Sequence, residues 1–186
     1  MKIFITGAAG FIGSSVAAGL VKAGHQVTGL VRDAAQVEQL KSIGVAGVTG
    51  SLDDRDILIA QSRAADAVIN TASSDHRGAV EAIIEALAGS NKVFLHTSGS
   101  SIVGDASGGE GTDKIYEEDQ LPAPTPDKAA RVAIDELVLA SAGSAGAASV
   151  PAVTSAAAGG GGSVAAASVG AAVGCGGVTA APACCA

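Results

Sequence analysis

Three glycines near the start of the chain, Gly7, Gly10 and Gly13, have a spacing that could do chemistry. They follow a short apolar run at 3–5 and precede a helical pattern over 11–23. A glycine turn between a strand and a helix presents unpaired backbone N–H groups, and the positive end of the helix dipole, to an anion. Gly7 suits a tight turn, Gly10 leaves room for a phosphate group, and Gly13 permits close packing of helix on strand. The motif therefore predicts a phosphate-binding site.

The elements that position this motif alternate along the chain. The spacing of apolar residues predicts strands at 3–5, 26–31, 45–49, 66–71 and 92–97, and helices at 11–23, 34–43, 53–63, 76–88 and 127–142. Asp53 or Asp54 suits the start of the third helix, and His76, at the start of the fourth, suits a cap or surface role. Strands that alternate with helices predict a parallel sheet covered on both faces. The polar loop over 98–126 follows the last strand, at an edge where loops carry function.

The spacing Gly-x-x-Gly-x-x-Gly over 7–13 resembles the extended and atypical branches of the short-chain dehydrogenase/reductase superfamily, of the NAD-dependent epimerase/dehydratase type. The resemblance implies an α/β fold, a doubly wound parallel sheet (Rossmann fold). It also implies that a nicotinamide dinucleotide lies on the glycine turn, in contact with the glycines and with Phe11 and Ile12. It covers 1–141 by sequence. Over 146–159 only the length matches that of the family's sixth strand and the turn after it.

Arg32 follows the second strand, where this fold contacts the adenosine ribose. An Asp or Glu there would bind the ribose hydroxyls of NAD, but the corresponding position is Val31. Because an Arg can pair with a 2′-phosphate through two hydrogen bonds, the sequence favours NADP, with NAD as the alternative. In that alternative Arg32 is a solvated surface residue and Asp33 binds the ribose.

Two further turns resemble the family's adenosine contacts. Ser51 and Leu52 follow the third strand, and Ser51 stands where the family usually has Asp. Leu52 would supply apolar contact to the adenine. Ala72 and Ser73 follow the fourth strand and match the family's turn beside the adenosine ribose, although an ordinary polar loop remains an alternative. We predict no metal site.

Ser98 and Ser100 lie in a stretch similar to the family's Ser-rich segment, in which a hydroxyl holds the substrate oxygen. The family's proton donor is the Tyr of a Tyr-x-x-x-Lys pair, because the Lys lowers the pKa of the phenol. Here the alignment puts Asp127 and Arg131 at those two positions, so the pair is missing. Lys128 and Tyr116 are the nearest substitute donors.

Three readings follow. The first is an NADP-dependent oxidoreductase of a small carbonyl or alcohol substrate, with a substitute donor or with a substrate that needs none. The second is an NADP-binding sensor without catalysis. The third, a nucleotide-sugar epimerase or dehydratase, is disfavoured because those enzymes normally keep the Tyr and Lys.

The composition limits the kinds of partner that this chain can have. The formal net charge of −7 argues against nucleic-acid binding, and no long uninterrupted apolar run predicts a membrane span. The glycine turn interrupts the N-terminal apolar run too early for a signal peptide, so a cytoplasmic enzyme is expected. The family resemblance implies that the helices at 75–88 and 127–142 can pair into a homodimer. The alternative is that they only cover the sheet.

The end of the chain has a different composition. From Ala142 to Ala186 it uses only Ala, Gly, Ser, Val, Thr, Pro and Cys. We therefore divide the chain into an NAD(P)-binding domain at 1–159 and an Ala/Gly/Ser-rich tail at 160–186. We interpret the tail as a placeholder for part of the substrate-binding region and draw no redox conclusion from its cysteines.

Overall fold

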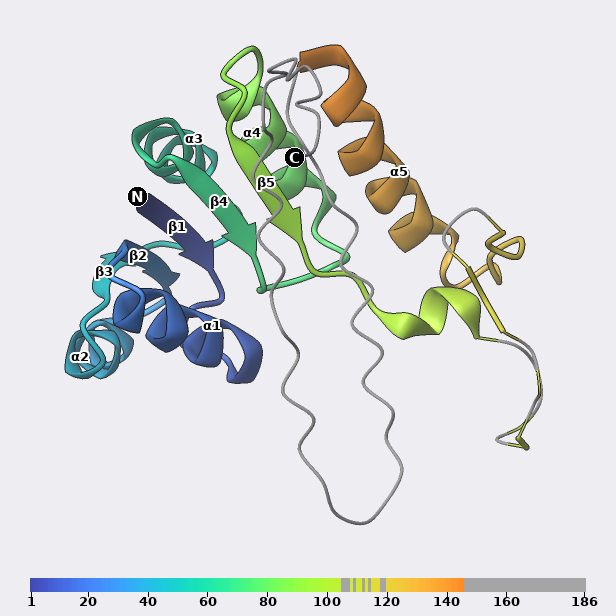
Figure 1. Ribbon diagram of the computed structural model, residues 1–186, viewed down its shortest axis with the longest axis horizontal. Coiled ribbons are helices and arrows are strands. Elements are labelled where there is room, and N and C mark those ends of the chain that lie inside the picture. The colour runs from blue at the N-terminus through green and yellow to red at the C-terminus, as the bar shows by residue number, and fades with distance from the viewer. Residues whose placement is uncertain (105–107, 109, 112, 114, 118–119, 146–186) are drawn as a thin grey trace, which may run out of the picture. The chain divides into compact units, whose positions relative to one another are not determined.

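The computed structural model describes residues 1–104, 108, 110–111, 113, 115–117 and 120–145. These residues form a parallel β-sheet with helices on both faces (Figure 1). The strands are β1 (Lys2–Thr6), β2 (Gln26–Val31), β3 (Ala46–Thr49), β4 (Ala67–Asn70) and β5 (Val93–His96). The helices are α1 (Phe11–Lys22), α2 (Ala34–Ser42), α3 (Arg55–Ala64), α4 (Arg77–Leu87) and α5 (Ala129–Ala145), with a 3₁₀ turn, η1 (Ser100–Val103).

The sheet has five strands in the order β3-β2-β1-β4-β5, and every neighbouring pair is parallel. The chain runs outward from β1 through β2 to β3, then crosses back to β4 and β5. The direction of winding thus changes between β1 and β4. In open α/β sheets, ligands bind outside the carboxyl ends of the strands at such a switch point. The predicted doubly wound Rossmann fold is confirmed.

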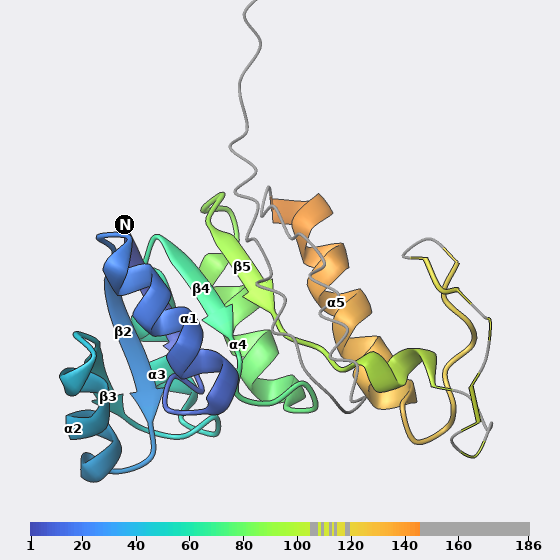
Figure 2. The same ribbon diagram turned by 60° about the horizontal axis from the view of Figure 1, so that its bottom comes forward.

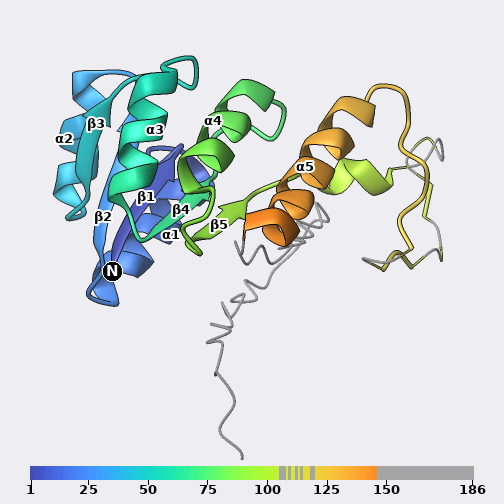
Figure 3. The ribbon, with the colours of Figure 1, turned by 90° about the horizontal axis from the view of Figure 1, so that it is seen from above.

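Successive side chains of β1 pack into cores on opposite faces of the sheet. Phe4 is buried in a core under α3, α4 and α5, whereas Ile3 and Ile5 are buried in a second core under α1 and α2. Successive side chains of a strand point to opposite faces, so one short strand anchors both layers. Figure 3 shows α3 and α4 on one side of the sheet and α1 on the other. The strand that precedes the glycine turn is therefore packed on both faces of the sheet.

The five strands and five helices predicted up to residue 142 are all present, with ends shifted by a few residues. The third helix begins at Arg55 instead of Asp53, because the residues before it form a hydrogen-bonded turn. The loop after β5 contains η1, which the sequence did not indicate, and η1 lies against the start of α5 (Figure 2). The sixth strand expected over 146–159 and the tail at 160–186 lie outside the described residues. No helix in the described part of the chain is long and apolar enough to cross a membrane.

Candidate functional site

The glycine turn after β1 has the geometry that its spacing predicts. Gly7 has φ of +73°, a left-handed conformation that favours glycine, and its carbonyl accepts the N–H of Gly10 at 2.9 Å. A Cβ on Gly13 would overlap the carbonyl oxygen of Gly7 and lie 2.6 Å from Oγ1 of Thr71. Helix α1 therefore starts in direct contact with the turn, and a side chain at position 13 would push it away.

The first turn of α1 is open to an anion. Gly10 occupies the N-cap without a side-chain hydrogen bond, and this turn, described in full, holds no acidic residue. In contrast, α2 and α4 are capped by side chains: Asp33 accepts the N–H of Gln36, and Nδ1 of His76 accepts the N–H of Ala79. The N–H groups that begin α1 have no acceptor within the helix, so an anionic group would satisfy them.

A pocket of about 440 Å³ lies at the carboxyl ends of β1, β2, β3 and β4. It brings together residues from four separate turns that the sequence predicts as cofactor contacts, namely Gly7, Gly10, Arg32, Ser51, Leu52 and Ala72. Gln36 and Thr71, which the sequence reasoning missed, also line it. Thr71 directly follows β4, next to the predicted Ala72, and that position was the available signal; Gln36 lies in the first turn of α2 and had none.

Arg32 and Asp33 have different local roles. The carboxylate of Asp33 accepts the backbone N–H of Gln36 at 2.9 Å, so it is held at the start of α2. The backbone N–H of Arg32 donates to Oε1 of Gln36 at 2.9 Å. This arrangement ties the turn after β2 to α2 through backbone atoms of Arg32. Its guanidinium takes no part in that bond.

Ser51 and Asp54 form the turn that leads into α3. The carboxylate of Asp54 accepts both the N–H and the hydroxyl of Ser51, at 2.6 and 3.0 Å. These bonds lower the pKa of Asp54 from its ordinary value. Asp54 thus occupies the N-cap of α3 as expected, but its side chain does not cap the helix. The turn presents Leu52 to the pocket.

Four other predicted cofactor contacts lie beside the pocket and are not among the residues that line it. Phe11 and Ile12, in the first turn of α1, are 93% and 49% exposed, and Gly13 is buried behind them. Ser73 follows the turn after β4, where its hydroxyl accepts the N–H of Asp75 at 3.2 Å. An exposed Phe at the mouth of an anion-accepting turn is available for contact with a bound molecule.

A row of polar side chains closes the ends of three neighbouring strands. Thr6, Asn70 and His96 are the last residues of β1, β4 and β5, and strand register places them side by side. Thr6 Oγ1 donates to Oδ1 of Asn70, and Nδ2 of Asn70 lies 2.9 Å from Nδ1 of His96. The sequence reasoning missed this row. The available signal was that a polar residue lies at or next to the end of each predicted strand.

Ser98 continues this row toward α5. Its hydroxyl donates to Oδ2 of Asp135 at 2.6 Å, and Oδ1 of Asp135 lies 3.7 Å from Nε2 of His96. Burial raises the pKa of Asp135, opposed by the Ser98 hydrogen bond. Burial also lowers the pKa of His96, opposed by the charge of Asp135. A carboxyl group with a raised pKa, bonded to a hydroxyl beyond the carboxyl end of β5, is typical of a functional site.

The two residues that the sequence predicts at the family's Tyr and Lys positions are held in other contacts. Arg131 binds Asp75 through two hydrogen bonds, at 2.8 and 2.6 Å, and donates to the hydroxyl of Ser101 at 2.9 Å. Asp127 pairs with Lys128 at 2.7 Å, which lowers the pKa of Asp127 to about 2. Asp127 is therefore ionised near neutral pH and cannot donate a proton as a Tyr would. Arg131 ties α5 to the loop after β4 and to η1.

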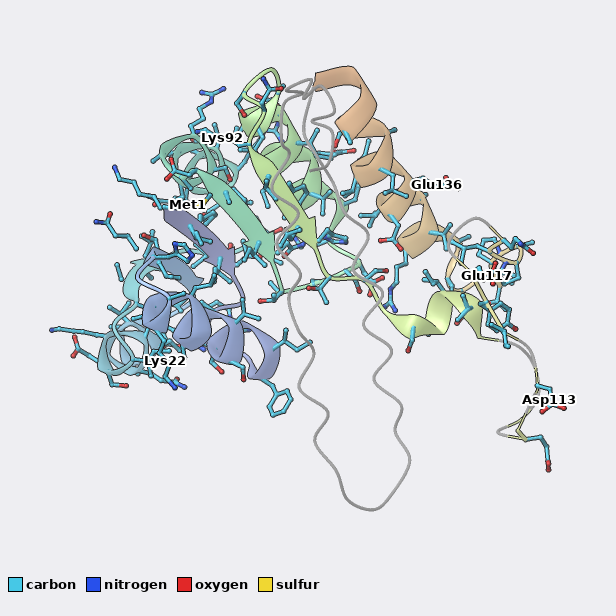
Figure 4. The ribbon with its side chains drawn as sticks, viewed as in Figure 1. Met1, Lys22, Lys92, Asp113, Glu117 and Glu136 are labelled. Carbon is cyan, nitrogen blue, oxygen red and sulfur yellow. The ribbon has the colours of Figure 1, made fainter. Side chains whose placement is uncertain are left out.

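The four predicted catalytic residues do not gather at one place. Ser98 joins the polar row, whereas Ser100 begins η1 and is exposed. Lys128 makes its ion pair with Asp127 at the start of α5. Tyr116 is half-buried in the loop before α5, and its neighbour Glu117 lies beyond η1, away from the strand ends (Figure 4). Among the described residues, no group of three or more His, Cys, Asp or Glu could hold a metal ion.

Comparison with known proteins identifies the relatives of this chain. Residues 3–168 match the model of the NAD dependent epimerase/dehydratase family. The uncharacterized protein YLL056C of Saccharomyces cerevisiae is 40% identical over 113 residues, which cover 54% of this chain and 38% of that protein. Isoflavone reductase homolog P3 of Arabidopsis thaliana is 34% identical over 106 residues, covering 50% and 34%. The chain thus matches less than half the length of these relatives.

Among solved structures, vestitone reductase from alfalfa superposes with a TM-score of 0.64 at 20% identity. The match covers 80% of this chain and 55% of that one. At this identity the likeness shows the fold alone.

Proposed function

The chain belongs to the NAD-dependent epimerase/dehydratase family, within the short-chain dehydrogenase/reductase superfamily, and from this premise we propose that it is an NADP-dependent oxidoreductase of a small carbonyl or alcohol substrate. The observation that carries the proposal is the pocket itself. It joins an uncapped helix start, an Arg and an apolar turn at the switch point of the sheet. These are the features that a pyrophosphate, a 2′-phosphate and an adenine require.

The residues of the pocket fit a nicotinamide dinucleotide. The open N–H groups at the start of α1 would bind its pyrophosphate, and a glycine suits position 10, since a Cβ there would lie only 3.2 Å from the carbonyl oxygen of Gly7. Leu52 and Ala72 would contact the adenosine. When bound, NADPH supplies a hydride for the reduction of a carbonyl group.

The preference for NADP rests on the turn after β2. Asp33, the residue that would bind the ribose hydroxyls of NAD, has a carboxylate oxygen engaged at the start of α2. Arg32 lines the pocket and carries a positive charge that a 2′-phosphate can use. The 2′-phosphate of NADP therefore has a suitable partner in Arg32, whereas the ribose diol of NAD has a weaker partner in Asp33.

A reductase is favoured over an epimerase or dehydratase. One matched relative is named an isoflavone reductase homolog, and that sequence likeness supports a reductase activity. Asp127 and Arg131 stand where epimerases of this superfamily normally have Tyr and Lys. A chain without that pair is poorly equipped for their chemistry.

A non-catalytic NADP sensor is the second candidate. It is supported by the same two positions, because both side chains are engaged in ion pairs at the start of α5. Turnover distinguishes the two candidates. We propose a cytoplasmic location for either.

The test is NADPH oxidation by the full chain, followed by absorbance with a panel of aldehydes, ketones and quinones. Binding of NADPH together with turnover of any member supports the oxidoreductase. Tight binding of NADPH without turnover of any member supports the sensor. Absence of NADPH and NADH binding contradicts both candidates.

We also propose a homodimer through α4 and α5, the two helices that cover the β5 edge of the sheet. Leu139 on α5 is 48% exposed and is available to such an interface. Light scattering at micromolar concentration checks this, and a monomer would contradict it.

A further inference from the structure

We propose that Ser98 and Asp135 together form the proton-exchanging pair of this chain, in place of the missing Tyr and Lys. The inference rests on the proposed function, because it names the groups that exchange a proton with the substrate oxygen. Ser98 is the group that would touch the substrate. Asp135 acts through Ser98, as a positioning and proton-supplying residue.

The pair is a hydrogen-bonded unit between the end of β5 and α5. The hydroxyl of Ser98 donates to Oδ2 of Asp135 at 2.6 Å, and the side chain of Asp135 is 19% exposed. While Asp135 is ionised, it holds the hydroxyl proton of Ser98. When Asp135 takes up a proton, it becomes the donor, and the hydroxyl of Ser98 is free to donate to another oxygen. A proton can thus pass from Asp135 through Ser98.

The polar row behind the pair fixes the protonation of His96. Oδ1 of Asn70 accepts the hydroxyl of Thr6 and the N–H of Ala72, so Nδ2 of Asn70 must be its donor. That group lies 2.9 Å from Nδ1 of His96, which must then accept. The imidazole is therefore neutral and carries its proton on Nε2.

Nε2 of His96 is the unexplained atom of this site. It is buried and has no hydrogen-bond partner among the described residues, and Oδ1 of Asp135 lies 3.7 Å away. A buried N–H without a partner is costly, and such groups are typical of sites that complete their bonding when they work. After Asp135 loses its proton, a small shift of α5 toward β5 would let this N–H donate a hydrogen bond to the carboxylate of Asp135.

The groups that face Asp135 come from three elements. Arg131, one turn earlier on α5, lowers its pKa, and Asp75 in the loop before α4 raises it, while His96 on β5 would lower it only with a protonated ring. Burial is the largest influence and raises the pKa. The guanidinium of Arg131 is bound to Asp75 in two hydrogen bonds, which limits its effect on Asp135. Asp135 therefore binds a proton more readily than an exposed Asp does.

The proton balance of a reduction follows. The substrate oxygen takes the hydroxyl proton of Ser98, Ser98 takes a proton from Asp135, and Asp135 is left ionised. The new C–H bond and both electrons come from the hydride of NADPH, so C=O becomes CH–OH. Asp135 regains its proton from solvent. Oxidation of an alcohol reverses each transfer.

The experiment uses the full chain with NADPH and 4-nitrobenzaldehyde as the probe substrate. Asp135→Asn keeps the size of the side chain but cannot supply the proton. Glu136→Gln makes the same charge change at the next residue, an exposed side chain on the side of α5 away from β5 (Figure 4). Ser98→Ala removes the hydroxyl, and Ser98→Thr retains it.

We expect Asp135→Asn and Ser98→Ala to lower kcat about 10²-fold and to abolish the pH dependence of kcat that Asp135 causes. Glu136→Gln should retain kcat within a few-fold, and Ser98→Thr, which keeps a hydroxyl, should restore most of the activity that Ser98→Ala loses. All four variants should bind NADPH with the affinity of the wild type, because none of the three positions lines the dinucleotide pocket. A wild-type pH profile in Asp135→Asn overturns the inference.

A second measurement does not depend on turnover. Carbon-detected NMR of the free chain should show that Asp135 titrates above its ordinary value of 3.8, and higher again in Ser98→Ala, where the hydrogen bond that lowers its pKa is lost. Titration of Asp135 at or below 3.8 in the wild type overturns the inference. If NADPH does not bind, or if the wild type has no turnover, the proposed function fails as well. If Asp135→Asn and Ser98→Ala reduce the aldehyde as fast as the wild type does, only the role of Ser98 and Asp135 is refuted, and the proposed function stands.

Discussion

Gly13 lies against the carbonyl oxygen of Gly7 so closely that a single added Cβ would overlap it. This contact between the first helix and the turn after β1 sets the position of the uncapped helix start. The same Cβ would lie 2.6 Å from Oγ1 of Thr71, in the turn after β4. One glycine thus allows both turns at the switch point to approach α1.

We predict that Gly13→Ala lowers the free energy of unfolding by at least about 1–3 kcal/mol, the usual cost of overpacking. The matched control is Gly19→Ala in the same helix, where an added Cβ meets nothing within 4 Å. It should stabilise the chain by about 0.5–1 kcal/mol, because Ala favours the helix over Gly. Urea unfolding of both variants checks this, and equal effects would contradict the close packing at Gly13.

The ion pair of Asp75 with Arg131 should make the free energy of unfolding depend on pH. Arg131 lowers the pKa of Asp75 below its ordinary value of 3.8. The folded-state pKa is depressed, so the stabilisation is present above pH 3.8 and is lost as the pH falls through the folded-state pKa. Asp75→Asn should therefore be less stable than the wild type near neutral pH, with a difference that shrinks in acid. A difference that stays constant down to about pH 3 would argue against this linkage.

His96 should destabilise the fold as the pH falls below 6.5, its ordinary pKa. Burial lowers the pKa of His96 in the folded chain, so the unfolded chain takes up its proton first. The stabilisation is present above 6.5 and is lost as the pH falls through the folded-state pKa. His96→Asn, which keeps an acceptor for Asn70, should remove this part of the pH dependence. Urea unfolding between about pH 8 and 5 measures it, and parallel curves for the two proteins would contradict the prediction.

Local patterns were enough to predict the order of strands and helices and the turn at Gly7. The signals are the short apolar run of β1 and the glycine spacing, which are properties of neighbouring residues. The pocket residues were also predictable, since Arg32, Leu52 and Ala72 each follow a strand, and parallel strands end at one edge.

The relation between His96 and Asp135 could not be predicted in the same way. The two residues lie on separate elements with the long loop between them, and nothing in the sequence sets the rotation of α5 against β5. The side chain of Asp54 does not cap α3 for a local reason, because its carboxylate accepts hydrogen bonds from Ser51 instead. Such choices depend on which donor lies nearer in three dimensions.

Arg32 tests the basis of cofactor selection. Arg32→Ala should weaken NADPH binding by roughly 1.5–3 kcal/mol, the usual value of a hydrogen bond to a charged group, which is about 10- to 150-fold in Kd. It should leave NADH binding nearly unchanged. Lys41→Ala, which removes an exposed cation paired with Glu38 on the adjoining helix α2, is the control and should change neither affinity. Equal losses for both cofactors would show that Arg32 does not contact the 2′-phosphate.

The most direct measurement is a calorimetric titration of the wild-type chain with NADPH and, separately, with NADH at the same salt concentration. The pocket at the switch point, with Arg32 on its wall and Asp33 turned to α2, predicts one site per chain and tighter binding of NADPH. Absence of binding, or tighter binding of NADH, would contradict the account.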